Sequence, residues 1–185
     1  MRANARRKLS VSNSWQHIRS LWKAAVEKPR PSRDVVRVLR RHFAEDGLIE
    51  RMACFEDFME ATNREPHVWG VTDCTLLIAD WALANGYPDP AIEWRGKYST
   101  EAECAALLAE RGGLSEVVRA CALDAGLKPL HEPQFGCVAV VGSKVRPERQ
   151  WSAIWNGHFW MVRWLGKDGP TWAPFVAPAL GMWRV

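Results

Sequence analysis

The stretch Val68-Trp69-Gly70-Val71-Thr72-Asp73-Cys74 is an aromatic and glycine turn that runs directly into an amphipathic segment. Asp73 has a short carboxylate that suits a helix N-cap, and Gly86 is suited to end the helix after Asn85. Between these two signals, apolar residues recur at helical spacing. They are Leu76, Leu77, Trp81 and Ala84. The stretch therefore predicts a buried helix with Cys74 in its first turn.

A thiol in the first turn of a helix has distinctive chemistry. Backbone N–H groups without partners and the positive end of the helix dipole lie close to it, and both favour the thiolate. Cys74 is therefore a candidate nucleophile. The alternative is a buried structural cysteine, which is the commoner role of a single Cys.

The hydrophobic period changes from helical to alternating after Gly126, so helices come first and strands follow. Helices are expected over 13–26, 32–46, 48–61, 74–85, 100–111 and 115–126. Strands are expected over 137–142, 151–155, 159–164, 171–175 and 181–185. Asn156-Gly157 and Lys167-Asp168-Gly169 are typical hairpin turns. We therefore predict an α+β domain whose antiparallel meander packs on the Cys74 helix.

The motif Trp-Gly-x-x-Asp-Cys before such a helix resembles the nucleophile motif of the NlpC-type cell-wall peptidases, a branch of the papain-like cysteine peptidases. A longer series of motifs resembles an uncharacterised family of that fold, found largely in tailed bacteriophages and prophages. The series is Trp69-Gly70, Asp73-Cys74, Asp80-Trp81, Asp89-Pro90, Arg95-Gly96, Tyr98, Gly112-Gly113-Leu114, Gly126-Leu127 and Trp183-Arg184-Val185. The resemblance covers residues 48–185 and implies a papain-like NlpC-type domain there.

The resemblance also implies a catalytic base, a His at the start of the second strand. Trp151 or Ser152 occupies that position here, and Cys137 replaces the acidic residue of the preceding strand. His158 is the nearest substitute, with Asp168 to orient its ring; the alternative for His158 is an ordinary polar hairpin residue. The expected catalytic residues are thus Cys74, His158 and Asp168. The expected substrate-binding residues are Trp69, Asp73 and Trp151.

The charges are unevenly distributed along the chain. Residues 1–41 hold twelve Lys or Arg and two acids, a net charge of +10, whereas the remainder carries −6. Trp15, Ile18, Leu21 and Trp22 form one apolar stripe in this basic segment. We expect residues 1–47 to be a helical extension that docks on another protein; nucleic acid is a possible partner but is not favoured.

Other features exclude several classes of protein. No apolar run is long enough to span a membrane, and no signal peptide is recognised at the N-terminus. The five cysteines are widely spaced and no His, Cys or carboxylate set has metal-ligand spacing, so we expect neither a disulfide framework nor a metal, and no cofactor.

Two functions are consistent with this sequence. The resemblance implies a phage tail-tip protein that cleaves cell-wall peptide as a cysteine peptidase or amidase, assembled into the virion tail in the host cytoplasm. The alternative is a catalytically inactive structural tail component that binds the tail hub or baseplate through residues 1–47.

Overall fold

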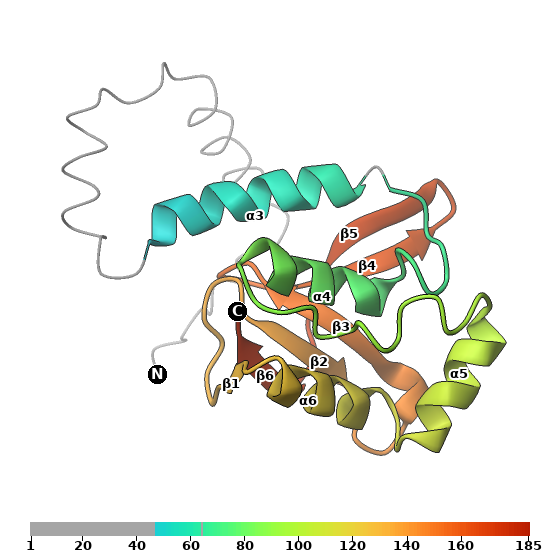
Figure 1. Cartoon of the computed structure of the whole chain (residues 1–185). Helices are drawn as coiled ribbons and strands as arrows, with labels where there is room; N and C mark the ends of the chain where they lie inside the picture. Colours follow the sequence, from blue (N-terminus) through green and yellow to red (C-terminus); the bar gives the residue numbers. More distant parts are fainter. Residues whose placement is uncertain (1–46, 64) are drawn as a thin grey trace, which may run out of the picture. The chain divides into compact units, whose positions relative to one another are not determined.

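The computed structural model of this chain describes residues 47–63 and 65–185, and residues 49–185 form one compact unit. The helices expected over 13–26 and 32–46 lie outside the described residues. The α-helices described are α3 Leu48–Asn63, α4 Cys74–Ala84, α5 Glu101–Glu110 and α6 Leu114–Asp124. The strands are β1 Lys128–Pro129, β2 Val138–Gly142, β3 Gln150–Trp155, β4 Trp160–Gly166, β5 Gly169–Phe175 and β6 Ala179–Arg184. Helices followed by an antiparallel sheet confirm the predicted α+β class (Figure 1).

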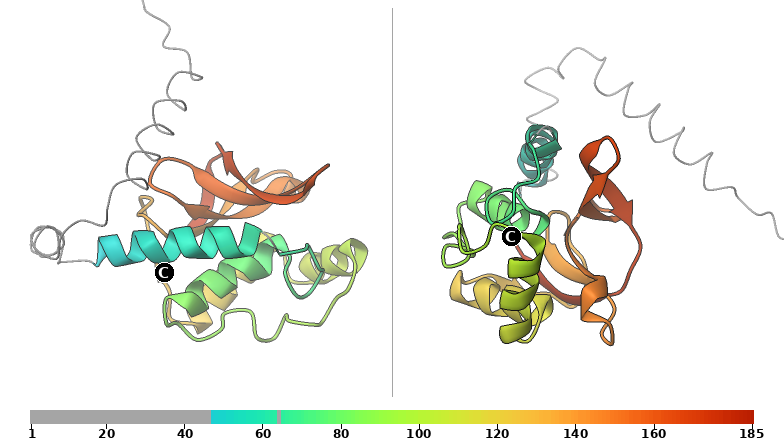
Figure 2. Two further views of the ribbon diagram at one scale, coloured as in Figure 1. Left: turned by 90° about the horizontal axis from the view of Figure 1, so that it is seen from above. Right: turned by 90° about the vertical axis from the view of Figure 1, so that its right-hand side faces the viewer.

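The helices cover one face of the sheet, and α4 lies against β3 and β4 (Figure 2, right). Trp81 of α4 is fully buried at the centre of this layer. Its ring meets Phe55 of α3 edge-on, with centroids 5.5 Å apart, and its Nε1 donates a hydrogen bond to Gly136 O at 2.7 Å. Burial of such an aromatic side chain is worth several kcal/mol, so Trp81 anchors α4 on both the sheet and α3.

The strand order is β1-β6-β2-β3-β4-β5, with antiparallel pairing throughout. A meander was expected, and β2 to β5 form one. The last strand, however, pairs with β2 instead of β5. The pairing of β6 with β2 is favoured by burial. In this register Trp183 lies opposite Val138, and both side chains pack against the helices.

The sheet is curled, as the β5–β6 connection requires. Only residues 176–178 join the two strands, which gives a reach of at most about 14 Å. In a flat sheet, four strand spacings of about 4.8 Å would separate them by roughly 19 Å. The curl brings Phe175 at the end of β5 to Trp151 at the start of β3, with ring centroids 5.0 Å apart. The concave face therefore buries its own apolar side chains, including Ala153, Trp160 and Val162.

The outer edge of β5 offers few free hydrogen-bond donors. Pro170 and Pro174 alternate with Trp172, whose N–H points outward and donates to Asn63 Oδ1 at 3.3 Å. Because proline has no N–H, the outward positions 170 and 174 cannot donate a hydrogen bond to another strand. This explains how a strand with two prolines is tolerated at the edge.

Candidate functional site

Gly70 shapes the turn in front of α4. Its φ is +73°, and a Cβ at this position would lie 2.1 Å from Tyr98 O. The close approach also lets Gly96 N donate to Gly70 O at 2.9 Å. Only glycine fits here, and the turn is thereby held against the segment that leads to Tyr98.

Asp73 is the N-cap of α4 and is 1% exposed. Its Oδ1 accepts hydrogen bonds from Thr75 N at 3.0 Å and Leu76 N at 3.1 Å. Its Oδ2 accepts from Gly70 N at 2.9 Å and from the Tyr98 hydroxyl at 2.6 Å. Burial and the Asp73 carboxylate raise the pKa of Tyr98, so this phenol remains a donor. The carboxylate is fully used in holding the turn, the helix start and Tyr98 together.

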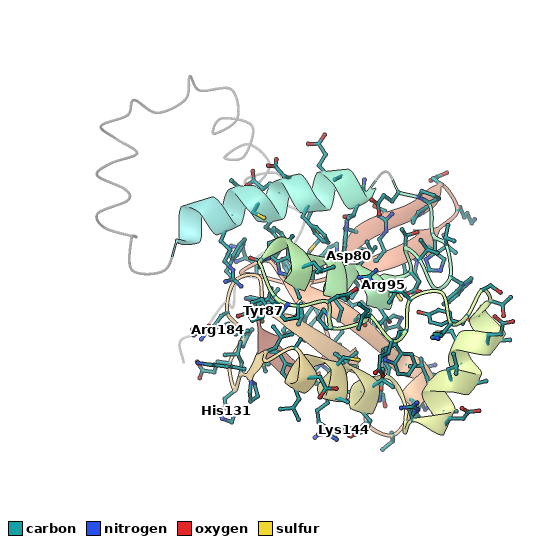
Figure 3. The ribbon with its side chains drawn as sticks, viewed as in Figure 1. Asp80, Tyr87, Arg95, His131, Lys144 and Arg184 are labelled. Carbon is teal, nitrogen blue, oxygen red and sulfur yellow. The ribbon has the colours of Figure 1, made fainter. Side chains whose placement is uncertain are left out.

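An ion pair supports the segment that carries Tyr98. Arg95 Nη2 donates to Asp80 Oδ1 at 2.6 Å and Arg95 Nε donates to Asp89 Oδ2 at 2.6 Å (Figure 3). Arg95 holds the pKa of Asp89 below its usual value, whereas burial raises the pKa of Asp80. The guanidinium thus ties residues 89–95 to α4.

Cys74 is the first residue of α4 and is partly buried. Its Sγ lies 4.0 Å from Thr75 Oγ1. Burial, and next the adjacent Asp73 carboxylate, raise its pKa to about 11. The expectation that the helix start favours the thiolate is therefore corrected: burial disfavours the charge, and Asp73 occupies the N–H groups of Thr75 and Leu76 and adds a negative charge beside the sulfur.

Ser152 is the β3 residue that faces the start of α4. It is 0% exposed, and its Oγ donates to Thr75 Oγ1 at 3.2 Å. Trp151 points to the opposite face of the sheet, where it packs on Phe175. Of the two positions at which the resemblance implies a base, Ser152 is thus the one that contacts the start of α4, through Thr75. The structure does not bring Trp151 to the thiol.

His158 and Asp168 are exposed residues in two different hairpin turns. The turn that holds His158 follows Trp155, the last residue of β3. This end of β3 lies near Trp81, because Gly136 accepts a hydrogen bond from Trp81 Nε1 and donates one to Trp155 O. Trp81 is about two helical turns, roughly 10 Å, from Cys74. Asp168 follows the opposite end of β4, about 20 Å of strand from His158. The structure does not bring Cys74, His158 and Asp168 together.

Two further residues near the start of α4 lie outside the expected catalytic and substrate-binding sets. Arg163 is 5% exposed and lies on the helix-facing side of β4. Because Ala153 is opposite Val162 in the β3–β4 pair, Arg163 lies opposite Ser152. It donates to Glu65 O at 2.7 Å, and burial lowers its pKa. Its buried Nε has no partner among the described residues. Met161, Arg163 and Leu165 alternate along β4 and so point to one face of the sheet. This alternation was the sequence pattern that could have indicated which face Arg163 occupies.

His67 is the second of these residues, and it lies in the same turn as Trp69. The two rings meet edge-on with centroids 4.7 Å apart. His67 Nε2 is buried and has no partner in the described part of the chain. Trp69 is partly exposed, and its neighbours Val68 and Val71 are exposed, so this turn presents an apolar surface in front of α4.

An apolar cavity of about 50 Å³ lies between α4, α5, α6 and β2. Thr75, Tyr98 and Cys104 line it on the side nearest Cys74. A cavity of this size and polarity accommodates a few methyl groups. The cavity is too small to hold a large side chain of a bound peptide.

Among residues 47–63 and 65–185, no group of three or more His, Cys, Asp or Glu side chains is arranged to hold a metal ion. No helix in the same ranges is long and apolar enough to cross a membrane.

No curated protein and no solved structure is significantly similar to the chain. The model of one protein family, described as "Domain of unknown function (DUF6950)", matches residues 50–185. Because the match spans most of the sequence, the chain belongs to the DUF6950 family.

Proposed function

We propose that this protein is a structural component of a bacteriophage tail tip, built on a papain-like NlpC-type domain that no longer cleaves peptidoglycan. The order of sequence motifs from Trp69 to Val185 supports the NlpC-type assignment, as does the packing of the Cys74 helix on an antiparallel sheet. The phage tail, assembled in the host cytoplasm, is inferred from the resemblance to the phage and prophage family.

The residue that carries the loss of hydrolysis is Ser152. A papain-like mechanism needs an imidazole to take the thiol proton and hold the thiolate as an ion pair. At this position Ser152 offers a hydroxyl that donates to Thr75. Burial and the adjacent Asp73 carboxylate raise the pKa of Cys74 to about 11, so the thiol form predominates at pH 7. Nucleophilic attack by Cys74 is correspondingly slow.

Hydrolysis of bacterial cell-wall peptide is the second candidate function. It is favoured by one observation, a partly buried cysteine at the first position of a helix whose N-cap is hydrogen-bonded. His67, on the preceding turn, is then the imidazole to consider in place of His158.

Binding to the tail is assigned to residues 1–47, whose net charge and tryptophan-bearing stripe suit an acidic surface with apolar pockets on the tail hub or baseplate. Nucleic acid is a less favoured partner for this segment.

The hydrolysis question is tested with purified full-length protein and muropeptides, with mass spectrometry of the products. We expect no cleavage by the wild type or by Cys74→Ala, while an active NlpC peptidase cleaves the same substrate. Cleavage by the wild type that is lost in Cys74→Ala contradicts the proposal and establishes the peptidase. Loss in a His67→Ala variant would then identify its base.

The tail assignment is tested by mass spectrometry of purified particles from a host carrying the gene. We expect the full-length protein in the particles and a variant lacking residues 1–30 only in the unassembled fraction. Absence of the full-length protein from the particles contradicts the assignment.

A further inference from the structure

The curl of the sheet leaves an open groove at one end of its concave face. Its volume is about 600 Å³, and it lies between the β2–β3 and β5–β6 connections. Apolar side chains form most of its walls. They are Trp151, Phe175, Val176, Ala177, Pro178 and Leu180. The mouth of a curled sheet is a common position for a binding site.

The groove and the Cys74 site are separate. Ser152 and Trp151 are adjacent in β3, so their side chains point to opposite faces of the sheet. Ser152 contacts α4 through Thr75, whereas Trp151 lines the groove. A ligand in the groove therefore does not touch the thiol.

One rim of the groove is basic. Lys144 and Arg149 line it, and neither forms an ion pair with another described residue. Lys144 projects from the lower edge of the domain in Figure 3. Residues 42–185 carry a net charge of −6. Two lysine or arginine side chains beside an apolar groove are therefore opposite in sign to the net charge of this part of the chain.

The β2–β3 connection, which carries Lys144 and Arg149, is held in place by hydrogen bonds among its own residues. Ser143 Oγ accepts from Val145 N at 3.3 Å and from Arg146 N at 3.2 Å. Ser143 O accepts from Gln150 Nε2 at 3.0 Å. A rim that is held in place before binding loses less conformational entropy when a partner arrives.

The shape of the groove selects among anionic ligands. Trp151 and Phe175 meet edge-to-face at 61°, so they do not offer the parallel stacking platform that single-stranded nucleic acids use. The groove is also wide open, and a small free acid would keep much of its surface in water. A segment of a folded partner is better suited, since contacts outside the groove add to its binding.

We propose that this groove is a docking site for an acidic peptide segment of a partner protein, which inserts a large apolar side chain between Trp151, Phe175 and Leu180 while its carboxylates bind Lys144 and Arg149. The residues that form this proposed site all lie between Gly142 and Leu180.

The test begins with a bead-displayed random heptapeptide library screened against the full-length protein and counter-screened against Val176→Asp. Val176 is 84% exposed on the groove wall, so a carboxylate there repels an acidic peptide without disturbing the core. The matched control is Leu123→Asp, because Leu123 is 68% exposed on α6 across the sheet. We expect enriched peptides to combine Asp or Glu with Leu, Phe or Trp.

The best peptide is then synthesised and its Kd measured by fluorescence anisotropy. We expect Val176→Asp and the double variant Lys144→Gln/Arg149→Gln to bind at least tenfold more weakly than the wild type. Leu123→Asp and the double variant Lys97→Gln/Lys128→Gln should bind as the wild type does. Higher salt should weaken wild-type binding.

Other outcomes overturn the proposal. They are failure to enrich any peptide over the Val176→Asp counter-screen, enrichment of peptides without acids, and equal affinity of the groove variants and the wild type. Competition by a dodecamer of thymidylate at lower concentration than the peptide would assign the groove to nucleic acid. Self-association that Val176→Asp abolishes would assign it to a second copy of the chain.

Discussion

At the scale of single residues, burial and next the Asp73 carboxylate raise the pKa of Cys74. The carboxylate occupies the N–H groups of Thr75 and Leu76, which would otherwise stabilise a thiolate at the start of α4. It also adds a negative charge beside the sulfur. The same residue therefore builds the helix start and suppresses the ionisation of the thiol. Across from Thr75, Ser152 offers a hydroxyl, which is a far weaker base than an imidazole.

Alkylation of Cys74 should follow its raised pKa. With iodoacetamide, we expect the rate at pH 7 to be well below that of a free cysteine and to rise about tenfold per pH unit up to pH 10, because the thiolate is the reactive form. Peptide mass spectrometry after timed quenching measures the rate at this cysteine. A rate at pH 7 equal to or above that of free cysteine contradicts the raised pKa.

The same titration should affect folding stability. The folded-state pKa is raised from 9.0 to about 11, so the folded form holds this proton more tightly than the unfolded form. Its contribution is fully present below pH 9 and is lost as the pH rises through 11. In urea unfolding, Cys74→Ala should lose less stability than the wild type between pH 9 and pH 11. An identical loss in both proteins contradicts this assignment.

At the scale of elements, the turn before α4 positions the site. Gly70 allows the turn to touch the Tyr98 backbone, and Asp73 then joins the turn, the helix and Tyr98 through four hydrogen bonds. Strands β3 and β4 present Ser152 and Arg163 to this point from the sheet. The helix start is thus a rigid junction of three segments.

A glycine pair tests this arrangement. Gly70→Ala places a Cβ 2.1 Å from Tyr98 O at φ +73°, so the turn must move. Gly86→Ala, at φ +84° with no atom within 4 Å, pays only for the backbone conformation. We expect Gly86→Ala to lower the free energy of unfolding by about 1 kcal/mol and Gly70→Ala by at least about 3 kcal/mol, as measured by urea denaturation. Equal losses would show that the contact with Tyr98 is not rigid.

At the scale of the whole domain, the sheet separates two surfaces. The helix-covered face holds Cys74, Ser152 and Arg163, and the concave face holds the groove beside Trp151. The outer edge of β5 is blocked by Pro170, Pro174 and the hydrogen bond from Trp172 to Asn63. These features disfavour the pairing of a further strand with this edge.

Removing the two prolines should restore an edge that pairs with other strands. We expect Pro170→Thr/Pro174→Thr to associate at protein concentrations at which the wild type does not, because two N–H groups now point outward from β5. Sedimentation velocity over a concentration series measures the change. Pro133→Thr, in an exposed loop, is the control. No difference between the double variant and this control would show that other features protect the edge.

The sequence by itself determined the described helices, most of the strands and the α+β class. Helical spacing, the Asp73 N-cap and the change to alternation after Gly126 are local signals, and each reports on residues a few positions apart. They were sufficient to put Cys74 at the first turn of a buried helix. The two-residue strand β1 was missed because Lys128-Pro129 is too short to show a period.

Only the tertiary structure decided which residues share a site. Whether Trp151 or Ser152 faces α4 depends on the register of β3, which residues far away in the chain set through β2 and β4. The distance from Cys74 to His158 depends on which end of β3 lies beside the start of α4. The position of β6 and the groove beside Trp151 follow from the curl of the sheet, a property of all its strands together. These are non-local quantities, and for that reason the sequence predicted the helix start but left Trp151 and Ser152 as alternatives opposite it.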